Sequence, residues 1–250
     1  YDGNANYTDR DIDQRELREY VHKGKKMLGV NINAKDAIEL VKSGAETAVI
    51  SLQQEEYTSD SHNVILDIPG KNGKYIVFTA HYDSTSLSQG AYDNMSGCIG
   101  LLYVAEYFLH HPHRCGIRLL WCGSEERGLL GSKAYCEQHQ EELSSAVLNI
   151  NLDMLGCIMG RFAAFSTDEK TSHYIECVAA EEGYGVDSKC AIRSSDSNSF
   201  VLHKIPSVSF ARYAPAEAGA IHTAFDTEAV LSPAQLLSDA RYVAAFVEDV

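Results

Sequence analysis

The sequence has no long apolar run and little positive charge. No stretch approaches the ~18 uninterrupted apolar residues that a membrane helix requires, so we expect no membrane partner. Its 21 lysine and arginine residues stand against 35 aspartate and glutamate residues, which gives a net charge of −14 at pH 7. Because nucleic acids and anionic membranes are also negatively charged, this balance argues against both as partners.

The sequence also lacks C-x-x-C pairs, internal repeats and low-complexity tracts. Its seven cysteines are odd in number, which suggests reduced thiols in a cytoplasmic protein. Their apolar settings, such as LLWCG and IECVAA, predict small core residues. No signal peptide is visible in the polar first residues, and secretion stays the alternative if an upstream segment has been removed.

Apolar residues make up 45% of the 250-residue chain, which is enough for one well-buried domain, with or without a small appendage. Strands alternate with helices, which predicts an α/β fold with a mainly parallel central sheet. The predicted strands cover residues 63–68, 75–80, 117–122, 147–153, 161–166, 186–192 and 208–213. The predicted helices cover residues 96–110, 169–182, 196–203 and 232–250. Helix 96–110 is so apolar that we expect it to be buried all round.

Polar side chains follow four predicted strands at the point where each strand ends. The strand over 75–80 stops at His81, the segments after 119–123 and 147–152 carry carboxylates, and His222 follows another strand near the C-terminus. In open α/β sheets, ligands bind at the carboxyl ends of the strands. Histidine and carboxylate side chains are the ligands of zinc and similar divalent metals, whereas a single histidine at a strand end is more often structural. The collected residues are His81, Asp83, Asp93, Glu125, Glu126, Asp153 and His222.

Five motifs in order resemble the di-zinc aminopeptidase family, which includes bacterial leucyl aminopeptidases and aminopeptidase Y. They are HYDS at 81–84, AYDN at 91–94, SEERGLLGS at 124–132, NLDMLG at 151–156 and IHTAFDT at 221–227. The resemblance runs from residue 64 to the C-terminus. It implies the zinc exopeptidase fold, a three-layer α/β/α sandwich with a mixed, mainly parallel sheet. It also implies a cis peptide bond after Asp93.

The resemblance further implies two Zn²⁺ ions and their ligands. Asp93 would bridge the two ions, His81 and Asp153 would complete one ion, and Glu126 and His222 would complete the other. A bridging carboxylate offsets the repulsion between two close cations.

The remaining roles concern residues that would not hold metal. Glu125 would be the general base, because adjacent residues at a strand end point in different directions. The carboxylate of Asp83 would accept the second N–H of the His81 imidazole. Tyr213 is our candidate oxyanion stabiliser, since Ile221 occupies the place where some relatives have a tyrosine; simple packing of Tyr213 is the equal alternative.

Two positions near these motifs keep more than one interpretation. Asp226 would orient His222 or form a turn. Asp196 is followed by Ser197 where relatives commonly have a histidine, which affects only the local surroundings of the site.

The sequence therefore predicts a zinc-dependent aminopeptidase that hydrolyses the N-terminal residue from peptides with a free N-terminus. A glutaminyl cyclase, a metallocarboxypeptidase or a non-catalytic domain of the transferrin-receptor kind are the alternatives on the same fold. The sequence does not indicate the preferred first residue or the oligomeric state. The pocket that sets this preference would be built by loops such as 84–90, 156–160 and 214–219.

The first part of the chain has a different sequence pattern from the rest. We assign residues 1–44 to an N-terminal extension and residues 45–250 to the catalytic domain. Within the extension the pattern predicts helices over 11–25 and 34–41. The catalytic domain is predicted to begin with a strand over 47–53. The extension resembles the trailing end of a protease-associated insert, and a solvated helical appendage is the alternative.

Overall fold

The computed structural model describes residues 21–22, 25–26, 30, 32–51, 53, 55, 57–214, 220–248 and 250. A seven-stranded sheet organises this part of the chain, with strand order β3-β5-β4-β6-β9-β7-β8. The strands are β3 (Val64–Ile68), β4 (Tyr75–His81), β5 (Gly116–Cys122), β6 (Ala146–Leu152), β7 (Arg161–Ser166), β8 (Asp187–Cys190) and β9 (Ser207–Tyr213).

The four central strands β5, β4, β6 and β9 run parallel to one another. At the edges, β3 is antiparallel to β5 and β7 is antiparallel to β9, while β8 runs parallel to β7. The sheet is therefore mixed and mainly parallel, as predicted. Because the central strands share one direction, their carboxyl ends meet at one edge of the sheet.

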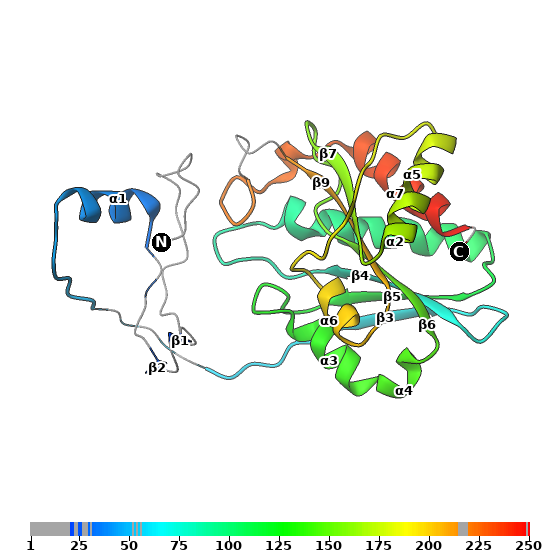
Figure 1. Ribbon diagram of the computed structural model, residues 1–250, viewed down its shortest axis with the longest axis horizontal. Coiled ribbons are helices and arrows are strands. Elements are labelled where there is room, and N and C mark those ends of the chain that lie inside the picture. Colours follow the sequence, from blue (N-terminus) through cyan, green and yellow to red (C-terminus); the bar gives the residue numbers. More distant parts are fainter. Residues whose placement is uncertain are drawn as a thin grey trace.

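Helices cover both faces of the sheet and complete a three-layer α/β/α sandwich (Figure 1). One face carries α2 (Ser96–His110), α5 (Glu169–Glu181) and α7 (Pro233–Glu248). The other face carries α3 (Leu130–Gln138), α4 (Gln140–Leu143) and α6 (Ser197–Leu202). Short helices η1 (Ala91–Met95) and η3 (Glu228–Val230) lie in the connecting loops. The predicted fold class is confirmed.

Strand β4 is mostly apolar because both of its faces are buried. Ile76 and Phe78 are fully buried on the face that packs against α2, while Val77 is fully buried in a second cluster with Phe200 of α6. Apolar side chains therefore occupy both faces of most of this strand, because each face packs against a layer of helices.

Helix α2 differs from its prediction. It packs one side against the sheet and also contacts α7, but Ile99, Leu102 and Leu109 are 44%, 59% and 62% exposed. The expectation that this helix is buried all round is therefore wrong, because its outer side has no covering layer in the described part of the chain.

The extension also differs in part from the prediction. Helix α1 (Ala34–Lys42) confirms the helix over 34–41, and the side chain of Asn33 caps it by accepting a hydrogen bond from the Lys35 N–H at 2.8 Å. Figure 1 shows α1 outside the sandwich. The helix predicted over 11–25 is wrong at its end, where Val21–His22 (β1) pairs with Lys25–Lys26 (β2) in a two-stranded antiparallel sheet. Residues 11–20, 23 and 24 lie outside the described residues.

No strand forms among the described residues of the segment 47–53, so that prediction is wrong as well. Val49 and Ile50 in this segment are 98% and 57% exposed. Residues of high β propensity form a strand only when a neighbouring strand and a packing surface are present.

Two further properties of the described chain concern membrane-spanning helices and the state of the cysteines. None of its helices combines the length and the apolarity that crossing a membrane requires. All seven cysteines are free thiols, and five of them are buried, which confirms the expected core role for those five. The prediction is wrong for Cys177 in IECVAA and for Cys190, which are exposed.

Candidate metal centre

Five side chains from five separate segments converge at the carboxyl edge of the parallel strands. His81 is the last residue of β4, Glu126 follows β5, and Asp153 comes directly after β6. Asp93 lies in η1, and His222 lies in the loop between β9 and η3. These are the five residues that the sequence singles out as metal ligands, and the fold brings all of them together.

The five residues form two triads that share Asp93. In the first triad, Nε2 of His81 lies 3.1 Å from Oδ1 of Asp93 and 3.5 Å from Oδ1 of Asp153. In the second, Nε2 of His222 lies 3.2 Å from Oδ2 of Asp93 and 3.1 Å from Oε1 of Glu126. Asp93 thus presents one carboxylate oxygen to each triad, which is the arrangement of a bridging ligand.

The spacing of these atoms fits zinc. Within each triad the potential ligand atoms lie within 4.8 Å of one another. Tetrahedral zinc with bonds of about 2.0–2.1 Å holds its ligand atoms about 3.3 Å apart. The buried Oδ1 of Asp153 makes no hydrogen bond in the described chain, so it is free to bind a cation. Each triad contributes one neutral nitrogen donor and carboxylate oxygens, a donor set that zinc accepts.

The carboxylates also favour positive charge at both histidines. Burial lowers the pKa of His81, whereas the three nearby aspartates raise it. The net result is a pKa well above the usual 6.5. Hydrogen bonds to Asp93 and Glu126 raise the pKa of His222 to about 10. A metal ion that binds here displaces the protons of both imidazoles, because only the neutral ring is a ligand.

The loop that carries Asp93 is fixed by hydrogen bonds from distant segments. The Asp93–Asn94 peptide bond is cis, as the family resemblance predicts. Asn94 donates to the Leu152 carbonyl at 2.9 Å, and its side-chain oxygen accepts from the Met154 N–H at 3.0 Å. Asn94 therefore ties the Asp93 loop to the end of β6, next to Asp153. Sequence analysis missed this role, although the AYDN motif contains the residue.

Asp226 fixes the same loop from the other side. Its two carboxylate oxygens accept the backbone N–H groups of Tyr92 at 2.6 Å and Asp93 at 3.1 Å. Neither of the roles considered for Asp226, orienting His222 or forming a turn, describes this contact. Asp226 instead links the segment of His222 to the backbone of Asp93, across 133 positions of sequence.

Asp83 positions its neighbours in a different way from the predicted one. The Nδ1 atom of His81 lies 3.0 Å from the backbone carbonyl of Asp83 and 3.6 Å from its carboxylate, which is too long for a hydrogen bond. The carboxylate instead accepts the backbone N–H groups of Glu125 at 2.9 Å and Glu126 at 3.1 Å. The predicted contact is thus corrected: the Asp83 carbonyl fixes the His81 ring, and the carboxylate holds the Glu125–Glu126 segment in place.

Glu125 differs in environment from the neighbouring Glu126. Burial raises the pKa of Glu125 to about 8, and the nearby carboxylates of Asp153 and Glu126 contribute in the same direction. Glu126 lies in the second triad, whereas Glu125 belongs to neither triad. The two adjacent glutamates therefore serve different positions, as predicted from their place at a strand end.

Tyr213 ends β9 at the same edge of the sheet. Burial raises the pKa of its hydroxyl, with a further contribution from Asp153. The hydroxyl has no hydrogen-bond partner within the described residues, and the ring packs edge-to-face against Phe165 at 5.9 Å. The two alternatives for Tyr213, oxyanion stabilisation and packing, stay open on this geometry.

A buried polar network lies behind Asp153. The Ser195 hydroxyl donates to Oδ2 of Asp153 at 2.6 Å, and the Asn151 amide donates to Ser195 at 2.8 Å. Thr79 on β4 donates to Asn151 at 2.8 Å and extends the network into the sheet. Ser195 thus leaves only Oδ1 of Asp153 facing His81, a role that the sequence analysis did not assign.

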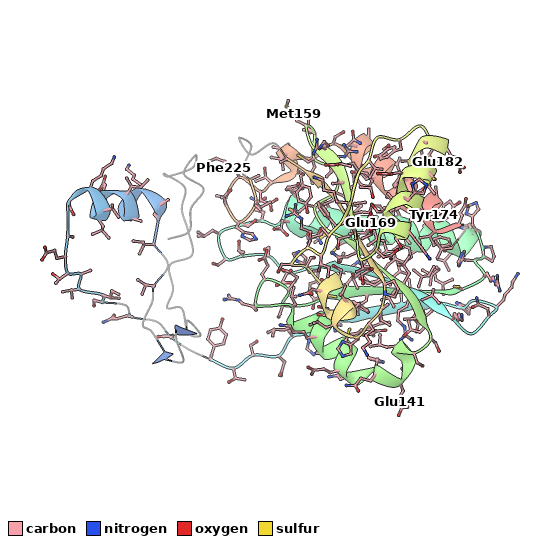
Figure 2. The ribbon with its side chains drawn as sticks, viewed as in Figure 1. Glu141, Met159, Glu169, Tyr174, Glu182 and Phe225 are labelled. Atoms are coloured by element: carbon pink, nitrogen blue, oxygen red, sulfur yellow. The ribbon has the colours of Figure 1, made fainter. Side chains whose placement is uncertain are left out.

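Exposed apolar side chains lie on the loops that follow the ligands. Phe225 on the loop of His222 is 72% exposed, and Met159 on the loop after Asp153 is 78% exposed. Figure 2 shows both at the periphery of the sandwich. Of the three loops predicted to set substrate preference, residues 215–219 lie outside the described residues.

Comparison with known proteins assigns the chain to a peptidase family and agrees with the fold. The model of Peptidase family M28 matches residues 63–247. Aminopeptidase YwaD of Bacillus subtilis is 33% identical over 163 residues, which cover 62% of this chain and 36% of that protein. The structure of BSAP, a zinc aminopeptidase from Bacillus subtilis, is 29% identical with a TM-score of 0.69, over 75% of this chain and 49% of that chain.

A third neighbour shares the fold alone. The glutaminyl cyclase of an Acidobacteriales bacterium is 20% identical with a TM-score of 0.66, over 74% of this chain and 72% of that chain.

The family match covers most of the chain, and the two-triad site lies within it. The protein belongs to peptidase family M28. The chain spans about a third of the length of the curated relative YwaD and about half of the BSAP structure.

Proposed function

We propose that the protein is a zinc-dependent aminopeptidase that removes the N-terminal residue from peptides. The observation that carries this proposal is the pair of triads joined by Asp93, with Glu125 beside them and outside both. We place the catalytic domain at residues 45–250, with residues 1–44 as an N-terminal extension.

Two zinc ions would be held by His81 and Asp153 on one side, by Glu126 and His222 on the other, and by Asp93 between them. Zinc in such a site polarises the scissile carbonyl and lowers the pKa of water to about 7.

Glu125 is the proposed general base and acid. Its carboxyl group takes the proton of the attacking water and delivers it to the amine that leaves. Burial raises the pKa of Glu125 to about 8 in the metal-free site, and a perturbed carboxyl group of this kind beside a metal centre is typical of a catalytic acid or base. Asp83 contributes by holding the backbone of Glu125 in place. Tyr213 remains the candidate donor to the developing oxyanion.

The charge of the site suits a substrate with a free amino group. Six carboxylates gather at this edge of the sheet, two more negative charges than two Zn²⁺ ions would neutralise, and an ammonium or amine is the complementary group of a peptide N-terminus. They are Asp83, Asp93, Glu125, Glu126, Asp153 and Asp226. N-acetylated peptides should therefore be poor substrates.

The test combines metal analysis with turnover of aminoacyl-p-nitroanilides. The wild-type protein should bind two zinc ions per chain, and a chelator should abolish turnover. Glu125→Gln should keep both ions and the fold while kcat falls ~10²–10⁴-fold, because it removes a proton acceptor but no ligand.

Glu126→Gln is the matched control, since it makes the same chemical change one residue later and should weaken metal binding instead. Turnover by Glu125→Gln at the parent rate would show that the base lies elsewhere. Cyclisation of glutaminyl peptides without peptide hydrolysis would replace the proposal with the cyclase alternative.

A further inference from the structure

An arginine is held against two aromatic rings at the edge of the metal centre. The guanidinium carbon of Arg193 lies 4.4 Å from the centroid of the Phe165 ring and 5.3 Å from that of the Tyr213 ring. The rings of Phe165 on β7 and Tyr213 on β9 lie 5.9 Å apart between their centroids. The residues paired between them on the same two strands, Ala163 and Ala211, are small. The rings thus form a defined platform for the cation.

Stacking of this kind leaves the donors of a guanidinium available. The N–H groups lie in the plane of the group, so a ring against its face does not occupy them. Arg118, Arg161 and Arg212 each pair with an aspartate. Arg193 is exposed and has no hydrogen bond or ion pair with any described residue. It is therefore an oriented cation whose N–H donors are free.

Short connections place Arg193 beside the proposed active site. Ser195, two residues further on, donates to Asp153 at 2.6 Å. Tyr213 ends the strand whose Phe210 carbonyl accepts the backbone N–H of Asp153 at 3.0 Å. A chain of two residues spans at most about 7 Å, so the distance between Arg193 and the metal ligands is on the scale of a very short peptide.

The charge of Arg193 is opposite to that of the carboxylates in the proposed active site. The carboxylates of the site suit a cationic N-terminus, whereas a guanidinium with free in-plane donors binds a carboxylate in a bidentate manner. A dipeptide or tripeptide carries both groups, separated by one or two residues. A longer or amidated peptide offers no carboxylate at that distance.

We propose that Arg193 binds the C-terminal carboxylate of short peptides and makes the enzyme prefer dipeptides and tripeptides with a free C-terminus. This inference rests on the proposed aminopeptidase function and names the substrate class of the same site. Arg193 acts in it as a specificity-determining residue.

The experiment compares substrates that differ only in the carboxylate. The best N-terminal residue from the p-nitroanilide panel is placed in a dipeptide Xaa-Gly, in its amide Xaa-Gly-NH₂ and in the p-nitroanilide itself. The wild-type enzyme should favour Xaa-Gly over its amide. Arg193→Ala should lower kcat/KM for Xaa-Gly by ~10-fold or more, mainly through KM, because a charge-assisted hydrogen bond is lost. Turnover of the amide and of the p-nitroanilide should change less than about twofold.

Matched variants separate charge from packing. Arg193→Met keeps a long side chain against the rings and should lose the preference as Arg193→Ala does. Arg193→Lys keeps the charge and should restore part of it. Arg241→Ala removes an exposed arginine from α7 and should leave all three substrates unaffected.

Binding gives a readout that does not depend on turnover. In the Glu125→Gln background, calorimetry should show that Arg193→Met weakens binding of Xaa-Gly but not of Xaa-Gly-NH₂. Equal losses for the acid and the amide, or no loss for either, would overturn the carboxylate site while leaving the aminopeptidase proposal intact. Failure of the wild-type protein to turn over any of the three substrates would overturn both.

Discussion

The buried carboxylate of Asp196 should make the stability of the metal-free protein depend on pH. Its side chain is 0% exposed, and neither oxygen has a hydrogen-bond partner among the described residues. The neighbouring Ser132 hydroxyl contacts the Leu129 carbonyl at 3.3 Å and the Ser199 hydroxyl at 2.9 Å instead. Burial raises the pKa of Asp196 from 3.8 to about 6, because the charged form has lost water without gaining donors.

The size and sign of the effect follow from that difference in pKa. A folded-state pKa of about 6 against 3.8 in the unfolded chain corresponds to about 3 kcal/mol. Since the folded pKa is raised, the contribution of Asp196 to stability is fully present below the unfolded value of 3.8 and is lost as the pH rises through about 6. Of this loss, about 1.4 kcal/mol falls between about pH 5 and about pH 7.5.

Urea unfolding of the wild-type protein and of Asp196→Asn, both in EDTA, measures this loss. Asparagine keeps the shape but does not ionise, so the variant should gain about 1.4 kcal/mol relative to wild type between about pH 5 and about pH 7.5. Any pH-independent change that the amide makes to the free energy of unfolding cancels when the two pH values are compared. Asp60→Asn serves as the exposed control. An equal difference between wild type and Asp196→Asn at both pH values would refute the reasoning.

Three further substitutions test the contacts that hold the site. Gly97→Ala should destabilise the protein by ~2–4 kcal/mol in thermal unfolding, because a Cβ there would lie 2.3 Å from the Leu152 carbonyl oxygen; normal stability would contradict this. Asp239→Asn should cost ~3–5 kcal/mol in urea unfolding, because it leaves the Arg212 guanidinium, which contacts Asp239 at 2.6 Å, without its buried partner. Asp226→Asn should keep the fold but weaken zinc binding ~10–100-fold in chelator competition, since one of the two backbone N–H groups loses its acceptor; unchanged affinity would argue against its positioning role.

Sequence patterns could predict the centre of this fold for a physical reason. The buried parallel strands are mostly apolar, although β6 also carries Asn149 and Asn151, and each strand ends where the chain reaches the sheet edge. The chemistry-bearing residues His81 and Asp153 stand at those ends, so periodicity alone places them together. The family resemblance then assigned roles that spacing could not, such as the shared position of Asp93.

The contacts that position the ligands could not be predicted in the same way. Asp226 binds the backbone of residues 92 and 93, and Arg193 stacks on rings from two other strands. Such contacts depend on how distant segments meet, which local patterns do not encode. The strand predicted over 47–53 does not form for a related reason: high β propensity does not produce a strand unless a partner strand is present.

The hydrogen bonds that hold the ligand loops bear on the order in which the protein folds and takes up metal. His81 ends β4, near the start of the sheet-forming sequence, whereas His222 follows β9, the last strand. The two histidines are therefore far apart in the unfolded chain, unlike the closely spaced ligands of a zinc finger. Asp83 and Asp226 hold the ligand backbone through protein groups alone. We therefore expect the topology to form before the proposed zinc ions bind, so that removing zinc with a chelator should leave a folded protein that takes the metal up again.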